Sequence, residues 1–205
     1  MKPFEPWTKY PPLIKERLSP IAGIIRRVRE QTVALHDPLG GDDELCLGCR
    51  IYSRICHAIR QAVKEYDWLT IVREDDKPLR FIFAIGSVPI RFYHGQAGDP
   101  PARYLLTSPA EARQQNLALE FDGITFEDEK LRLAVETDAQ RHVSTITLVA
   151  MDQFGNAIEG YSIPFGIEPG NVTQIQAKPI DLAPPQVKPL KSEKDEKKDR
   201  DVRSQ

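Results

Sequence analysis

The amino-acid sequence predicts an α+β fold, in which two long N-terminal helices pack on a mainly antiparallel sheet and a disordered, charged C-terminal tail follows. Apolar residues recur at helical spacing in the first third of the chain, whereas from Trp68 onwards the pattern has a period of two. Runs of helix followed by runs of strand are typical of the α+β class. Ten of the 17 prolines lie in the first twelve and the last 42 residues, which confines the folded domain between two flanks.

Composition divides the chain of 205 residues into four segments. Residues 1–12 form a Pro-rich N-terminal arm, residues 13–165 a single α+β domain, residues 166–187 a Pro-rich extended linker, and residues 188–205 the tail. The tail has only two aliphatic residues among many charged ones. It cannot bury enough apolar surface to offset the entropy of ordering, so we expect it to be disordered.

Two amphipathic helices are expected in the first part of the domain. Ser19 and Pro20 resemble an N-cap followed by proline at the first helical position, which predicts a helix to about Leu35. Asp42 or Asp43 can cap a second helix that runs to about residue 66. Its apolar face is predicted from residues at alternating spacings of four and three: Leu45, Cys49, Tyr52, Cys56, Ile59, Val63 and Tyr66, widened on one side by Ile51, Ile55, Ala58 and Ala62.

Strands dominate the rest of the domain. The β-rich runs 68–74 and 79–85 flank turn residues at 75–78 and predict a hairpin, and a further extended run covers 88–93. Ser108 and Glu111 form a capping box that predicts a short third helix. Strands are then expected at 131–137, 144–152 and 157–165, the last two joined by a hairpin turn at 153–156.

Composition excludes several classes of protein. The net charge of −2 argues against a globally basic nucleic-acid coat. Three cysteines within residues 46–56 cannot form an even disulfide framework, and no apolar run approaches the roughly 20 residues of a membrane span. The N-terminal residues lack the apolar segment of a secretory signal. We therefore expect a cytoplasmic protein that does not contact membranes.

Motifs of common catalytic and cofactor sites are not found. The sequence contains no GxSxG, GxGxxG, GxxxxGKS or HExxH pattern. Cys46, Cys49, Cys56 and His57 could supply zinc ligands, but a continuous helix would hold Cys49 and Cys56 about 10 Å apart along its axis. Core packing is the favoured interpretation of these cysteines. No catalytic residue, metal ligand or cofactor is predicted.

Basic residues on the second helix form the first candidate binding surface. Together with the neutral Gln61, they follow spacings of four and three and so lie in one stripe: Arg50, Arg54, His57 and Lys64. Such a stripe can contact the phosphates of a nucleic acid or the carboxylates of an acidic protein. The alternative is an ordinary solvated helix face.

The loop between residues 91 and 103 is the second candidate. Arg91 and His94 end one extended run, and Arg103 begins the next after a loop that is rich in glycine and proline. If the three side chains converge, their donors would suit an anionic ligand such as phosphate or carboxylate. The alternative is a rigid connection with exposed polar ends.

A third pattern indicates metal-dependent chemistry on phosphate esters. Asp75 and Lys77, and likewise Asp128 and Lys130, place an acidic residue two positions before a lysine, an arrangement that can hold a divalent cation and position water. Neither pair lies within a predicted strand, where such sites normally lie.

The predicted function is a non-catalytic binding or regulatory module. It would engage a protein or a nucleic acid through Arg50, Arg54 and Lys64 on the helix and through Arg91, His94 and Arg103 at the loop. The alternatives are a metal-dependent nuclease or phosphoesterase, and a structural subunit of a protein complex.

Overall fold

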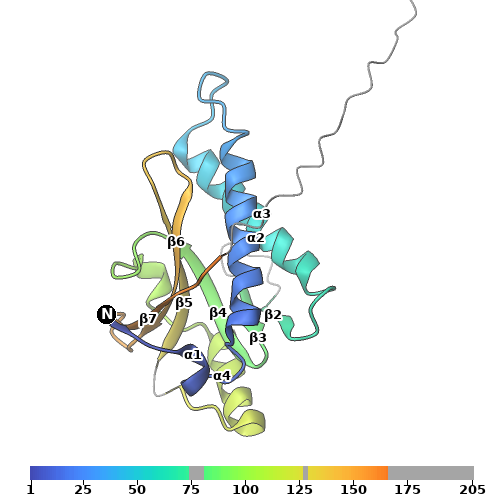
Figure 1. Ribbon diagram of the computed structural model, residues 1–205, viewed down its shortest axis with the longest axis vertical. Coiled ribbons are helices and arrows are strands. Elements are labelled where there is room, and N and C mark those ends of the chain that lie inside the picture. The colour runs from blue at the N-terminus through green and yellow to red at the C-terminus, as the bar shows by residue number, and fades with distance from the viewer. Residues whose placement is uncertain (74–80, 127–128, 166–205) are drawn as a thin grey trace, which may run out of the picture. The chain divides into compact units, whose positions relative to one another are not determined.

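The computed structural model describes residues 1–73, 81–126 and 129–165 (Figure 1). The helices are α1 (Pro6–Lys9), α2 (Lys15–Val33), α3 (Glu44–Ala62), the 3₁₀ helix η2 (Ala102–Tyr104) and α4 (Pro109–Asp122). The strands are β1 (Lys2–Pro3), β2 (Leu69–Arg73), β3 (Ile82–Ile85), β4 (Val88–His94), β5 (Lys130–Thr137), β6 (Val143–Met151) and β7 (Ala157–Ser162). The predicted turn at 75–78 and the predicted linker and tail lie outside the described residues.

The strands form one mixed sheet in the order β1-β7-β6-β5-β4-β3-β2. All neighbouring strands are antiparallel except β1 with β7 and β4 with β5. The prediction of an α+β fold with a mostly antiparallel sheet is therefore confirmed.

The parallel pair of β4 and β5 is the feature that positions the candidate site. Its strands are joined by a long crossover that contains η2 and α4, as a parallel connection requires. His94 pairs with Val135, so the carboxyl ends of both strands lie at the same edge of the sheet. The crossover brings η2 back towards this edge.

Helices α2 and α3 cover one face of the sheet (Figure 1). Alternate residues of the central strands point into this layer, where Ile90 and Leu133 pack in one cluster with Ile25 and Ile59 of the helices. A second, smaller cluster on the opposite face contains Tyr93 with residues of the crossover and of β5 and β6: Ala97, Tyr104, Ala134, Val149 and Met151.

Two details of the predicted helices differ from the structure. Helix α2 begins at Lys15 rather than at Pro20, because a proline in the second helical turn removes one hydrogen bond without ending a helix that packs on the core. On α3 the buried face is rotated towards Ile51 and Ile55, whereas Leu45 and Cys49 are exposed. The side on which α3 meets α2 and the sheet decides this rotation.

Local capping and turn signals were predicted correctly. The Asp43 carboxylate accepts a hydrogen bond from the Cys46 N–H (2.6 Å) and caps α3. Ser108 and Glu111 form the predicted capping box at the start of α4. The hairpin between β6 and β7 turns at Gly155, whose φ of 90° is accessible mainly to glycine.

The Pro-rich N-terminal arm, residues 1–12, lies against the sheet. Strand β1 pairs with β7, and Tyr10 is fully buried. The Tyr10 hydroxyl donates a hydrogen bond to Glu129 (2.7 Å), and the Lys9 ammonium pairs with the same carboxylate (2.6 Å). No helix in the described part of the chain is both long and apolar enough to cross a membrane.

Candidate functional site

A half-open pocket of about 280 Å³ lies where α3, the ends of β4 and β5, and η2 meet; we call it the α3–β4 pocket. Its polar lining residues are Arg29, Glu44, Cys49, His94 and Arg103. Its walls are otherwise mostly apolar and include the rings of Tyr52, Phe92, Tyr93 and Tyr104. The pocket lies at the carboxyl ends of parallel strands, where ligand sites are common in α/β sheets.

Arg29 and His94 form the polar centre of the pocket. Arg29 comes from the last turns of α2, and its Nη2 lies 3.3 Å from His94 Nε2. Thr137 Oγ1 lies 3.1 Å from the same ring nitrogen. Because a guanidinium can only donate, Nε2 is the acceptor of both hydrogen bonds and the ring proton is on Nδ1. Burial and the Arg29 charge lower the pKa of His94 below its ordinary 6.5, so its imidazole is neutral at pH 7.

The burial of Arg29 is unusual for a cation. Its exposed fraction is 5%, and its Nε donates to the Arg141 carbonyl at 3.0 Å. Burial and the nearby Arg141 charge lower its pKa, although an arginine keeps its proton at neutral pH. Glu44 is paired with Arg141 at the rim of the pocket. Within the described part of the chain, no carboxylate lies within ion-pair distance of Arg29, and the Glu44 charge acts on it only from further away.

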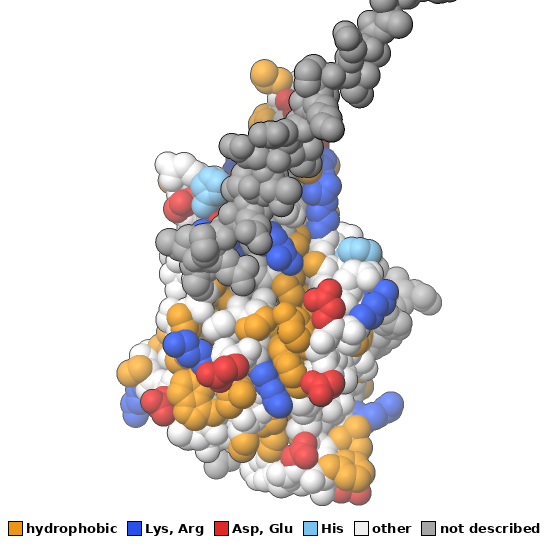
Figure 2. All heavy atoms as spheres, turned by 45° about the vertical axis from the view of Figure 1, so that its right-hand side comes forward, with side chains coloured by type: hydrophobic (Ala, Val, Ile, Leu, Met, Phe, Trp, Pro, Cys, Tyr) orange, Lys and Arg blue, Asp and Glu red, His pale blue; other side chains and the backbone are white. Residues whose placement is uncertain are grey.

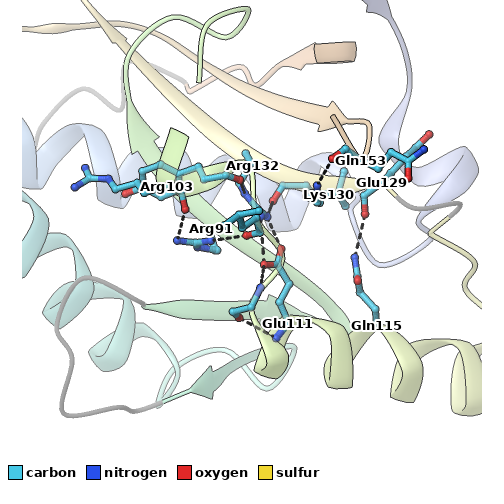
Figure 3. A network of polar contacts seen from close by, with 12 residues as sticks. Arg91, Arg103, Glu111, Gln115, Glu129, Lys130, Arg132 and Gln153 are labelled. Atoms are coloured by element: carbon cyan, nitrogen blue, oxygen red, sulfur yellow. Dashed lines mark hydrogen bonds and ion pairs between the residues drawn. The ribbon is translucent and has the colours of Figure 1, made fainter. Parts of the chain in front are cut away.

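The predicted loop residues are divided between two roles. His94 and Arg103 line the pocket, whereas Arg91 is buried behind it and donates to the Leu106 and Arg103 carbonyls (3.3 and 3.5 Å). The guanidinium carbons of Arg91 and Arg103 lie 4.8 and 5.0 Å from the centre of the Tyr104 ring. Arg91 therefore supports Tyr104, and the Arg103 guanidinium extends away from the interior network (Figure 3).

Aromatic side chains form much of the apolar wall. The rings of Tyr52 and Phe92 are 5.1 Å apart, and those of Tyr93 and Tyr104 are 5.5 Å apart. The Tyr52 hydroxyl accepts a hydrogen bond from the Phe81 N–H (3.2 Å), and burial raises the pKa of Tyr52. The Tyr52 hydroxyl is therefore neutral and adds no negative charge to the apolar wall of the pocket.

The predicted basic stripe on α3 lies apart from the pocket lining. Arg50 forms two hydrogen bonds with Asp42 (2.7 and 3.0 Å), which neutralises its charge. Arg54 and His57 line a shallow groove between α2 and α3, where Arg54 Nη1 lies 3.5 Å from Thr32 Oγ1. The Lys64 ammonium donates a hydrogen bond to the Gln61 side chain. On the face shown in Figure 2, acidic and basic side chains are interspersed around a strip of hydrophobic ones. Among the described side chains that are visible on this face, no extended surface of a single charge sign is seen.

A second polar network is structural. Arg132 and Glu111 pair with both side chains fully buried, and Arg132 also donates to the Tyr104 carbonyl (3.1 Å; Figure 3). The network holds α4 and η2 against β5. It thereby positions Tyr104 and Arg103 at the pocket.

The other predicted sites gain little support from the described residues. Cys56 is buried in the core as expected, but Cys46 and Cys49 are exposed, and no group of three potential metal ligands is found among the described residues. Asp75, Lys77 and Asp128 of the nuclease pattern lie outside them. The Lys130 ammonium donates to the Asp152 and Gln153 carbonyls, at 3.4 and 3.2 Å.

Sequence reasoning missed Arg29 as a site residue. It follows Ile21 and Ile25 at intervals of four and so continues the apolar stripe of its helix. That spacing was the available signal. No local pattern in the sequence indicates that Tyr104 lies near Tyr52 and Phe92, because the long crossover between β4 and β5 brings these residues together.

The chain was compared with protein families, curated proteins and solved structures. No family model, curated protein or solved structure matches it.

Proposed function

We propose that this protein is a non-catalytic binding or regulatory module, and that the α3–β4 pocket receives an anionic group of its ligand. One observation carries the proposal: Arg29 is a buried cation without a carboxylate partner, and it lines a pocket with His94 and Arg103. A buried charge is costly unless it is paired. An anion in the pocket would supply the missing partner.

Hydrogen-bond capacity supports the same conclusion. Arg29 uses its Nε for the Arg141 carbonyl and its Nη2 for His94. A guanidinium has five N–H donors, so three of them remain for a ligand. The Nδ1–H of His94 adds a neutral donor. Guanidinium forks are well suited to carboxylate and phosphate oxygens.

The state of His94 favours binding over acid–base catalysis. A general base needs a free lone pair on its ring nitrogen, but Nε2 of His94 already accepts from Arg29 and Thr137. The imidazole is therefore arranged to donate a hydrogen bond from Nδ1.

A macromolecular partner bound along α3 is the second candidate. Arg54 and His57 are exposed on α3, and Lys64 is exposed in the turn that follows the helix. Such a basic surface adds salt-dependent affinity for nucleic acids or acidic proteins. Neutralisation of Arg50 by Asp42 makes this candidate weaker than the pocket.

The pocket can be tested by NMR titration with inorganic phosphate and with acetate. We expect both anions to shift the amide signals of residues that line the pocket, and Arg103→Gln to weaken binding at least about fivefold, as the loss of one charged hydrogen bond predicts. Lys64→Gln is the matched control, because it removes an exposed cation outside the pocket, and it should leave binding unchanged. If no pocket signal shifts, the proposal is wrong. An oligonucleotide whose binding is weakened by Lys64→Gln but not by Arg103→Gln would instead support the α3 face.

A further inference from the structure

We propose that the ligand of the α3–β4 pocket is a small amphipathic anion, in which a single carboxylate or phosphate group is joined to a flat aromatic body. This inference rests on the proposed function, because it uses the same pocket and the same anion-binding end. It adds the chemical class of the remainder of the ligand. Three properties of the pocket support it: its division into two chemically different parts, its size and its charge.

The pocket is divided between a polar end and an apolar wall. Arg29 and His94 mark the polar end, and Arg103 lies over the Tyr104 ring in the same lining. The Tyr52 and Phe92 rings, with Ile51 and Ile55 of α3, provide the apolar part. A bare anion would leave this apolar surface in contact with water. A ligand with an aromatic body would cover it and could stack against the rings.

The volume limits the ligand to a small molecule. At about 280 Å³ the pocket lies just below the usual range for drug-sized ligands. It has room for roughly ten non-hydrogen atoms at the ~30 Å³ that a water molecule occupies in the liquid, and for somewhat more when the atoms are covalently joined. One aromatic ring with one acidic group has this size.

The charge of the lining favours a ligand with one acidic group. Arg29 and Arg103 are the two cations of the lining, and the Glu44 carboxylate is compensated by its pairing with Arg141. Of the two cations only Arg29 is buried, and Arg103 is exposed to solvent. One acidic group would therefore neutralise the buried charge, while Arg103 would add affinity from the rim.

The test is a calorimetric titration with a matched series of probes: benzoate and phenyl phosphate, acetate and inorganic phosphate, and benzyl alcohol. Benzoate and phenyl phosphate should bind at least tenfold more tightly than acetate and inorganic phosphate respectively. Benzyl alcohol, which has the ring without the charge, should bind at least tenfold more weakly than benzoate. A difference between benzoate and phenyl phosphate would identify the preferred acidic group.

Substitution of Gly48 provides a variant that blocks the pocket without unfolding the protein. Gly48 lies in α3 and lines the pocket, and a Cβ there meets nothing within 4 Å. Gly48→Leu should improve helix propensity and place a side chain at the pocket mouth. We expect it to lower benzoate affinity at least tenfold while stability is kept. Gly23→Leu, at an equally open helical position in α2 outside the lining, is the control.

The outcomes separate the two proposals. If acetate and phosphate bind at the pocket as tightly as their aromatic counterparts, the amphipathic ligand is excluded and the anion site stands. If benzyl alcohol binds as tightly as benzoate, or if none of the probes binds, the anion site itself is wrong. If Gly48→Leu leaves benzoate binding unchanged, the aromatic body does not lie in the pocket.

Discussion

At the scale of single residues, the pair of Arg29 and His94 links the pocket to the pH dependence of stability. Arg29 is buried and donates to Nε2 of His94, so a second positive charge on the ring is unfavourable in the folded state. Burial and Arg29 together lower the pKa of His94 below 6.5. The unfolded chain has no such restraint and binds the proton more readily.

The first prediction concerns this histidine. Below pH 6.5 the unfolded state binds more protons than the folded state, because the pKa of His94 is lowered only in the folded protein. The stability contributed by the neutral His94 is therefore present above pH 6.5. It is lost as the pH falls towards and through the lowered pKa. In His94→Gln the loss of unfolding free energy between pH 7.5 and pH 5, measured by urea denaturation, should be smaller than in the wild type. An equal loss in both proteins would show that His94 does not cause the dependence.

At the scale of secondary-structure elements, Glu111 serves α4 in two ways. Its side chain belongs to the capping box with Ser108, and it also pairs with Arg132 inside the protein. The sequence pattern predicts only the first role. The second requires that the crossover lies over β5, and it secures the element that carries Tyr104 and Arg103.

A pair of substitutions can separate these roles. Glu111→Gln keeps a side chain that can complete the capping box but removes the charge opposite Arg132, so we expect a loss of about 3–5 kcal/mol in unfolding free energy. Ser108→Ala removes the cap alone and should cost about 0.5–2 kcal/mol. Both values can be measured by chemical denaturation. Equal losses in the two variants would contradict a dominant role for the buried ion pair.

At the scale of the whole molecule, the N-terminal arm is connected to the sheet at positions distant in sequence. The Tyr10 hydroxyl and the Lys9 ammonium both contact Glu129, next to the start of β5, and β1 pairs with β7. The first residues therefore contact strands from the last part of the folded chain. No local pattern in the sequence predicts these contacts.

Removal of one hydroxyl tests the connection. Tyr10→Phe should lower the unfolding free energy by about 1.5–3 kcal/mol, the usual value of a hydrogen bond to a charged group. Tyr161→Phe is the control, because Tyr161 is a partly buried ring that packs edge-on against Trp7 (5.4 Å), and a change of less than about 0.5 kcal/mol is expected. A loss no larger than that of the control would show that the contact between Tyr10 and Glu129 contributes little to stability.

Local signals in the sequence determined the class of the fold and several ends of its elements. Asp43, Ser108 and Gly155 act where their side chains or backbone freedom predicted, because caps and turns depend on residues within a few positions of one another. The position of Arg91, His94 and Arg103 at one loop suggests that their side chains converge; the structure places His94 and Arg103 in the pocket lining but not Arg91.

Tertiary structure alone decided the pocket and its electrostatics. The parallel pairing of β4 with β5, the reach of Tyr104 to the pocket and the burial of Arg29 beside His94 all depend on contacts between distant segments. Periodicity shows that a helix has an apolar face but not which neighbour covers it. The sequence by itself therefore determined an α+β chain with a basic loop, and the packing of α2, α3 and the crossover made that loop one side of a candidate anion site.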